Sequence, residues 1–270
     1  MFTYSGPDGY DLAATAVGDQ GPVVVLLHGG GPDHRSLLPL AQLLADRCRV
    51  VLPDIRGYGV SRCPDPAWHT WKQYTRDVIT LLDHLGVSRA VVGGTGLGAT
   101  IAARALLTHP DRFHAGILIG VEDIESDEAK LAETALLDSF AATVMSDGVD
   151  AAWASILPGL APIIGTLVRE AIPRSDPASI AAAAAIGRDR GFRDATEYAS
   201  LTAPTLVFPG MDHRHPTGLA RELATIMPHG HLGPPFADGV ETVTELAEAL
   251  APRIRAFLAQ TVPSDPDVRT

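Results

Sequence analysis

Residues 90–106 contain the pattern that most restricts how this chain can fold. An apolar run, 90–93, leads into Gly94-Thr95-Gly96-Leu97-Gly98, and a segment rich in alanine and leucine, 99–106, follows it. The apolar run predicts a buried strand and the later segment predicts a helix. The glycines let the backbone turn sharply between the two, because glycine tolerates conformations that other residues avoid.

Three further apolar runs end in segments rich in glycine and polar residues. Val23–Leu27 leads to His28-Gly29-Gly30-Gly31, Val50–Pro53 leads to the segment 54–61, and Pro204–Gly210 leads to the segment 211–216. Continuous apolar runs of this length are typical of strands in a parallel sheet that is covered on both faces. Up to about residue 121 these strands alternate with amphipathic stretches, which predicts βαβ units.

These four segments, in this order, resemble the α/β-hydrolase superfamily over roughly residues 20 to 258. The opening 28–35 is most similar to the iminopeptidase, lactonase and esterase branches. The resemblance implies the α/β class, with a doubly wound, mostly parallel sheet formed by residues 1–121 and 204–260. It also implies a helical cap at 122–203, where the sequence offers helix after helix. We expect residues 261–270 to be a disordered tail.

Composition favours a cytoplasmic enzyme that binds a small molecule. The net charge is −11 and lysine and arginine form no cluster, so we expect neither a nucleic-acid partner nor a membrane partner. We expect no signal peptide and no membrane span, because the sequence has no basic region followed by an apolar stretch at residues 1–6 and no apolar run long enough to cross a bilayer. Cys48 and Cys63 are predicted to be reduced thiols. We expect no cofactor and no metal, and the oligomeric state is left open.

Glycine stands where the resembling family carries its nucleophile. The family motif is Gly-x-Ser-x-Gly, whose sharp turn presents the serine at the head of a helix. In this chain Gly96 occupies the serine position. Acyl-enzyme chemistry is therefore predicted to be absent. The resemblance implies an oxyanion hole made by the backbone N–H groups of Gly30 and Leu97, which does not depend on the side chain at 96.

The acid of the family's triad corresponds to Asp212, although an aspartate after a glycine turn also fits an Asx turn. The base is expected in the loop 234–241, but that loop contains no histidine. His215 is the candidate base, with a substrate contact or a loop-fixing hydrogen bond as the alternatives. Glu122 and Asp123 lie where some relatives place another acid, and a helix-capping role is the simpler prediction for both.

Apolar residues of the predicted cap favour an apolar or aromatic small substrate. Gly29, His34 and Trp153 are the predicted substrate contacts. The side chains expected to face inward, either to line a pocket or to pack the cap helices, are Phe140, Met145, Trp153, Ile156, Leu157, Leu160, Ile163, Ile164 and Leu167.

Three interpretations of Gly96 are open at this stage. If it replaces a natural serine, the function is hydrolysis of an ester, lactone, thioester or amide. If it is native, the oxyanion hole serves proton-transfer, lyase or cyclisation chemistry on a carbonyl compound, and the missing histidine favours this view. The third interpretation is a catalytically inactive, ligand-binding homologue.

Overall fold

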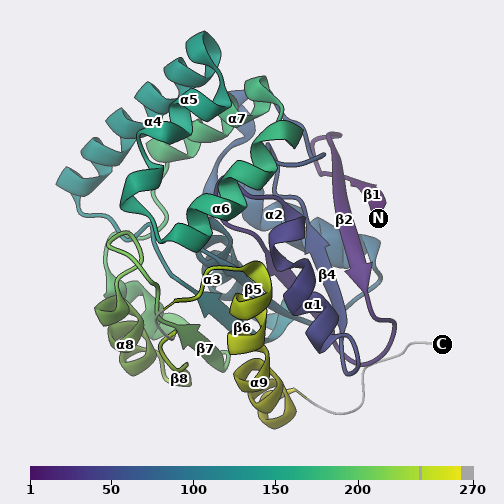
Figure 1. Cartoon of the computed structure of the whole chain (residues 1–270). Helices are drawn as coiled ribbons and strands as arrows, with labels where there is room; N and C mark the ends of the chain where they lie inside the picture. The colour runs from purple at the N-terminus through teal and green to yellow at the C-terminus, as the bar shows by residue number, and fades with distance from the viewer. Residues whose placement is uncertain (237–238, 263–270) are drawn as a thin grey trace.

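A computed structural model describes residues 1–236 and 239–262, and its centre is an eight-stranded sheet (Figure 1). The strand order is β1-β2-β4-β3-β5-β6-β7-β8; β1 and β2 pair antiparallel, as do β2 and β4, and the remaining pairs are parallel. The strands are β1 Phe2–Ser5, β2 Asp11–Val17, β3 Val23–Leu27, β4 Arg49–Pro53, β5 Ala90–Thr95, β6 Phe113–Ile119, β7 Thr205–Phe208 and β8 Gly230–Leu232. This confirms the predicted doubly wound, mostly parallel sheet.

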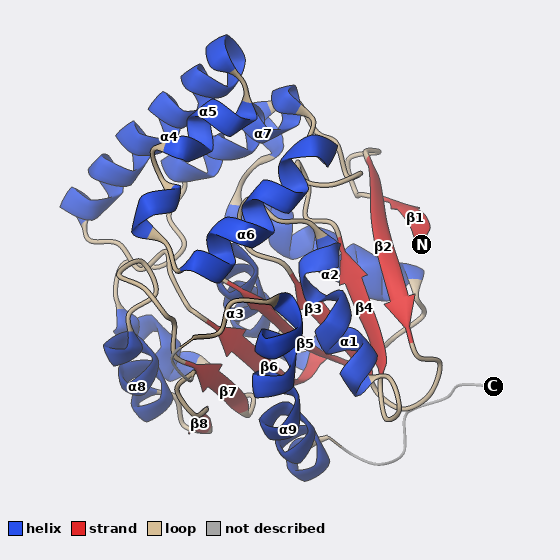
Figure 2. Ribbon diagram, in the orientation of Figure 1, coloured by secondary structure: helices blue, strands red, loops and turns tan. Residues whose placement is uncertain are grey.

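Helices cover both faces of the sheet (Figure 2). One apolar cluster joins the sheet to α2, α3 and α8, and a second joins its other face to α1 and α9. The helices are α1 Leu38–Leu44, α2 Trp71–His84, α3 Leu97–Thr108, α4 Asp127–Asp147, α5 Val149–Ala154, α6 Pro162–Ala171, α7 Pro177–Ala183, α8 Thr217–Ile226 and α9 Val243–Thr261.

The strand sequences explain why the sheet is covered twice. Successive side chains of a strand point to opposite faces. In β3, Val25 and Leu27 belong to the first cluster, whereas Val24 and Leu26 belong to the second. All four are at most 2% exposed. An uninterrupted apolar run therefore fills two cores at once, which fixes β3 at the centre of the sheet.

Residues 122–203 contribute none of the eight strands and hold α4 to α7. We call this stretch the helical segment. It lies on the side toward which the parallel strands point (Figure 1). Its helices α4, α5 and α7, with the turn that follows α7, share a small apolar cluster made by Phe140, Val144, Val149, Ala152, Ile180 and Ala184.

Three local expectations are corrected. The N-cap of α4 is Ser126, whose hydroxyl accepts the Ala129 N–H at 3.2 Å, so neither Glu122 nor Asp123 caps that helix. Met145 is 66% exposed instead of facing inward. Thr261, assigned to the tail, ends α9, and the rest of the predicted tail from residue 263 lies outside the described residues.

Cys48 and Cys63 are free and buried, as predicted. Within the described ranges, no helix combines the length and the apolar character needed to cross a bilayer.

Candidate functional site

Four strand ends meet at one edge of the sheet. Gly29 and Gly30 follow β3, Gly96 follows β5, Glu122 comes shortly after β6, and the loop that carries His215 follows β7. Because parallel strands present their carboxyl ends at a common edge, residues far apart in the sequence are brought together there. This edge also borders the helical segment.

The turn at Gly96 has the strained backbone that its sequence predicts. Gly96 has φ 50° and ψ −119°, and its N–H donates to Ile119 at 3.0 Å. A Cβ atom added at Gly96 would stand 2.9 Å from Oε1 of Glu122 and 3.5 Å from Nε2 of His215. The space beside residue 96 is therefore filled by the tip of a carboxylate that comes from another strand end.

Asp212 and His215, the candidate acid and the candidate base, are in contact. Oδ1 of Asp212 lies 2.7 Å from Nδ1 of His215. The same oxygen accepts the backbone N–H groups of Arg214 and His215, and Oδ2 accepts that of Ala161 at 3.0 Å. Asp212 thus fixes the backbone of its own loop and also orients the imidazole of His215. The Asx turn and the position beside the candidate base are both present.

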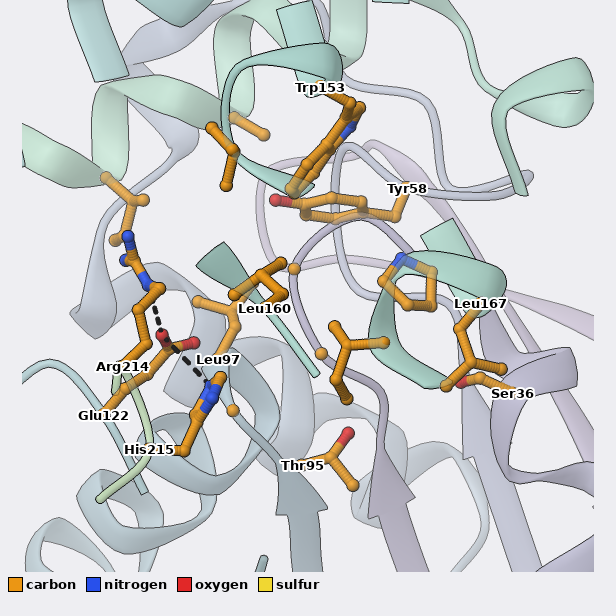
Figure 3. Close-up of a pocket in the computed structure, with 18 of the residues that line it drawn as sticks. Ser36, Tyr58, Thr95, Leu97, Glu122, Trp153, Leu160, Leu167, Arg214 and His215 are labelled. Atoms are coloured by element: carbon orange, nitrogen blue, oxygen red, sulfur yellow. Dashed lines mark hydrogen bonds and ion pairs between the residues drawn. The ribbon is translucent and has the colours of Figure 1, made fainter. Parts of the chain in front are cut away.

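Glu122 completes the cluster on the other side of the imidazole (Figure 3). Its Oε2 lies 3.4 Å from Nε2 of His215 and accepts Nε–H of Arg214 at 3.2 Å. Arg214 also donates to Glu133 of α4 at 2.8 Å. The two cations bind Oε2, and no hydrogen bond within residues 1–236 and 239–262 involves Oε1. Oε1 is therefore the oxygen available for chemistry.

The electrostatics of the cluster are those of an ion pair. Burial alone would raise the pKa of Glu122, but the hydrogen bond from His215 and the charges of His215 and Arg214 lower it to about 2. Burial alone would lower the pKa of His215, but its bonds to Asp212 and Glu122 raise it to about 10. The pKa of Asp212 is likewise lowered to about 2, because its hydrogen bonds outweigh burial. At neutral pH the site holds two carboxylates around an imidazolium.

The neighbouring carboxyl of Asp123 behaves in the opposite way. Its backbone has φ 61°, the only positive value among the described residues other than glycine, and its buried Oδ2 lacks a hydrogen-bond partner there. Burial, followed by the charge of Glu122, raises its pKa well above the usual range. Backbone strain of this kind clusters at functional sites.

A cavity of about 160 Å³ opens over Gly96. The lining includes Gly29, Gly30, Leu97, Trp153 and Tyr58, together with Glu122, Arg214 and His215 of the ionised cluster. Six of the nine side chains expected to face inward also line it: Phe140, Trp153, Ile156, Leu160, Ile164 and Leu167. A Cβ on Gly31 would lie only 2.7 Å from Cζ2 of Trp153, so glycine there lets the indole approach the loop after β3.

His34, predicted as a substrate contact, lies outside this lining. It is 7% exposed, and its Nδ1 lies 2.8 Å from Oδ1 of Asp54. Its role in the structure is to hold the loop after β4. Among the described residues no group of three or more His, Cys, Asp or Glu side chains is arranged to hold a metal ion.

Comparison with known proteins agrees with this architecture. The family described as alpha/beta hydrolase fold matches residues 22–151. The chain has the fold of the α/β-hydrolase superfamily. A thermophilic esterase from Thermogutta terrifontis superposes with a TM-score of 0.80 at 27% identity, over 96% of both chains.

Curated relatives match either a part of this chain at higher identity or most of it at lower identity. An epoxide hydrolase from Caballeronia sordidicola is 35% identical over 133 residues, which is 46% of this chain and 40% of that protein. The match thus spans well under two thirds of that relative. A 2-hydroxymuconate semialdehyde hydrolase from Pseudomonas putida is 27% identical over 91% of both chains. Both relatives are named as hydrolases.

The sequence predicted Gly96, Asp212 and His215 as parts of one site. It also indicated Glu122 as a candidate acid, from its place just after a predicted core strand, but a capping role was favoured there, and Arg214 was missed. The signal for Arg214 was its position between Asp212 and His215.

Proposed function

We propose that this protein is an enzyme that transfers a proton on a small, apolar carbonyl compound, with the carboxylate of Glu122 as the base. The observation that carries the proposal is the position of Oε1 of Glu122, 2.9 Å from where a Cβ on Gly96 would stand. In this reading Gly96 is native, and its missing side chain makes room for the carboxylate.

The proposed reaction uses two opposed groups. The carbonyl oxygen accepts hydrogen bonds from the backbone N–H groups of Gly30 and Leu97, which act as the oxyanion hole. Oε1 of Glu122 takes a proton from the carbon next to the carbonyl, and the electron pair of that C–H bond moves onto the oxygen as an enolate. The proton then returns from Glu122 to carbon, on another face or position. Alternatively, the enolate electron pair re-forms the carbonyl and a new C=C bond, a group on the next carbon leaves with its bonding electron pair, and Glu122 passes its proton to that group.

The ion pair keeps Glu122 ionised and thus able to accept a proton, although it also makes the carboxylate a weak base. A carboxylate with a pKa near 2 stays ionised at every physiological pH, so the base form is always present. Its low basicity requires the oxyanion hole to lower the pKa of the carbon acid, which fixed donors in a site that excludes water do well. His215 and Arg214 hold the carboxylate so that Oε1 faces the cavity.

The cavity limits the substrate to a small apolar body. A cavity of about 150 Å³ with apolar walls accommodates benzene, and this one measures about 160 Å³. Leu160, Ile164 and Leu167 supply much of its wall. We therefore expect a carbonyl group attached to one ring or to a short chain.

Hydrolysis is a second candidate, favoured by the hydrolase names of the relatives. In that reaction Oε1 of Glu122 attacks an electrophilic carbon and forms an ester, with the displaced group leaving with its electron pair. Water then attacks the ester carbonyl and restores the carboxylate. Both reactions need Glu122, and only the second forms a covalent adduct.

The first test is Glu122→Gln, which keeps the shape and removes the base. We expect the parent to exchange the α-protons of small ketones and aldehydes in deuterated buffer, followed by NMR, and E122Q to lose at least 100-fold in rate. Glu125→Gln is the control, since Glu125 pairs with Lys130 outside the cavity lining. Equal exchange by parent and E122Q would overturn the proposal. A stoichiometric mass increase on the Glu122 peptide, after mixing with epoxides, would favour hydrolysis.

A further inference from the structure

We infer that the hydroxyl of Tyr58 is a third donor to the substrate's carbonyl oxygen, which makes Tyr58 a catalytic residue beside the N–H groups of Gly30 and Leu97. The inference rests on the proposed function, because it assumes that negative charge develops on that oxygen.

Tyr58 is rigidly held by its turn. Its N–H donates to Ile55 at 2.9 Å, and its carbonyl accepts from Ser61 at 3.0 Å. The ring also meets the imidazole of His28 edge-on, with 5.5 Å between centroids. His28 is itself fixed, because its Nε2 accepts the Ile55 N–H at 3.0 Å. The loops after β3 and β4 therefore lock the direction of the phenol.

The hydroxyl stands on the wall of the cavity next to the proposed oxyanion hole. It lies 3.8 Å from the point that a Cβ on Gly30 would occupy, and that point is 4.0 Å from Cβ of Leu97. Figure 3 shows the ring crossing the cavity below Trp153, with its hydroxyl end toward the side that holds Glu122 and Arg214. Tyr58 lines the cavity, as do Gly30 and Leu97.

The hydroxyl is also free to donate. No hydrogen bond within residues 1–236 and 239–262 involves it, and only burial and nearby charges act on the phenol, whereas buried tyrosine hydroxyls usually find a partner. Burial, followed by the negative charges of Glu122 and Asp123, raises the pKa of Tyr58. The phenol therefore keeps its proton at neutral pH and acts as a hydrogen-bond donor. The proton that is transferred in the proposed reaction is the one that Glu122 takes from the substrate carbon.

The test uses p-nitrophenolate, whose oxyanion sits on a single ring that matches the size of the cavity. It is carried out in Glu122→Gln, since removing that negative charge mimics the protonated carboxyl and favours the anion. Absorbance of the phenolate reports binding directly. Nitrobenzene, which has the ring without the oxyanion, reports shape alone. Because no turnover is involved, the outcome does not depend on whether Glu122 is the base.

We expect Tyr58→Phe in the E122Q background to weaken p-nitrophenolate binding about tenfold, as loss of one hydrogen bond to a charged group would, and to leave nitrobenzene binding unchanged. Tyr198→Phe is the matched control, since its hydroxyl is buried and unpartnered among the described residues but lies outside the cavity lining. It should alter neither ligand's affinity.

Three results would overturn the inference: no binding of p-nitrophenolate by E122Q, an unchanged phenolate affinity in the Tyr58→Phe variant, or an equal loss for both ligands. The proposed function fails separately, if E122Q still exchanges α-protons. In the chain that retains Glu122, Tyr58→Phe should lower kcat for that exchange and leave KM within twofold, whereas a packing role would raise KM.

Discussion

At the scale of single residues, Gly96 and Glu122 depend on each other. Gly96 has φ 50°, and a Cβ there would press on Oε1 of Glu122. We expect Gly96→Ala to cost about 1–3 kcal/mol of unfolding free energy from backbone strain and to lower the α-proton exchange rate by displacing the carboxylate. Gly86→Ala is the control, because Gly86 has φ 66° with nothing within 4 Å of its added Cβ. Urea denaturation should report a cost in both variants, and loss of exchange in the first alone. An active Gly96→Ala chain would contradict the steric argument.

The ionisation of His215 gives a second prediction at this scale. Its folded pKa of about 10 lies above the ordinary 6.5, so its stabilisation is complete below 6.5 and is lost as pH rises through 10. Glu122 is depressed from 4.5 to about 2, so its contribution is complete above 4.5 and is lost toward 2. Both groups keep their charges between about pH 5 and 9, so the rate of α-proton exchange should be constant in that range. The rate should fall as pH rises through about 10, where His215 loses its proton.

Replacing one partner of the imidazole should shift that profile. Asp212→Asn removes one of the two carboxylates that raise the pKa of His215. The alkaline limb should then move to lower pH, and NMR of the imidazole nitrogens should show the same shift. A limb near 6.5 in the parent would mean that the ion pair does not form.

At the scale of elements, the sequence predicted what depends on local pattern. The apolar runs predicted β3, β4, β5 and β7, and the segment after the glycine-rich turn predicted α3. Knowing that parallel strands share a carboxyl edge was enough to bring Gly30, Gly96 and Asp212 together.

The contact between Glu122 and His215 could not be predicted from local pattern. Glu122 reaches His215 because Gly120 turns with φ 59° after β6, and a Cβ there would stand 3.5 Å from the imidazole. Such a turn depends on packing between two loops, which no local pattern encodes. His34 illustrates the reverse, since its buried contact with Asp54 joins two loops that lie 20 residues apart.

At the scale of the whole molecule, Arg56 ties the edge of the sheet to the site. Its guanidinium is fully buried between Asp8, in the β1–β2 turn, at 2.6 Å, and Asp77, in α2, at 2.8 Å. Two residues later the same loop carries Tyr58. Arg56→Met would leave two buried carboxylates without their cation, and removing one partner of a buried ion pair typically costs about 3–5 kcal/mol.

We therefore expect Arg56→Met to lower the midpoint of urea unfolding strongly while the slope of that transition stays constant. Arg188→Met is the control, because Arg188 pairs with Asp138 on the surface, where both side chains are largely exposed; its cost should be about 0–1 kcal/mol. In native conditions Arg56→Met should also weaken p-nitrophenolate binding in the E122Q background, since the turn that aims Tyr58 loses its anchor. If the two arginine variants unfolded at the same midpoint, the buried triad would not be what holds this edge of the molecule to the site.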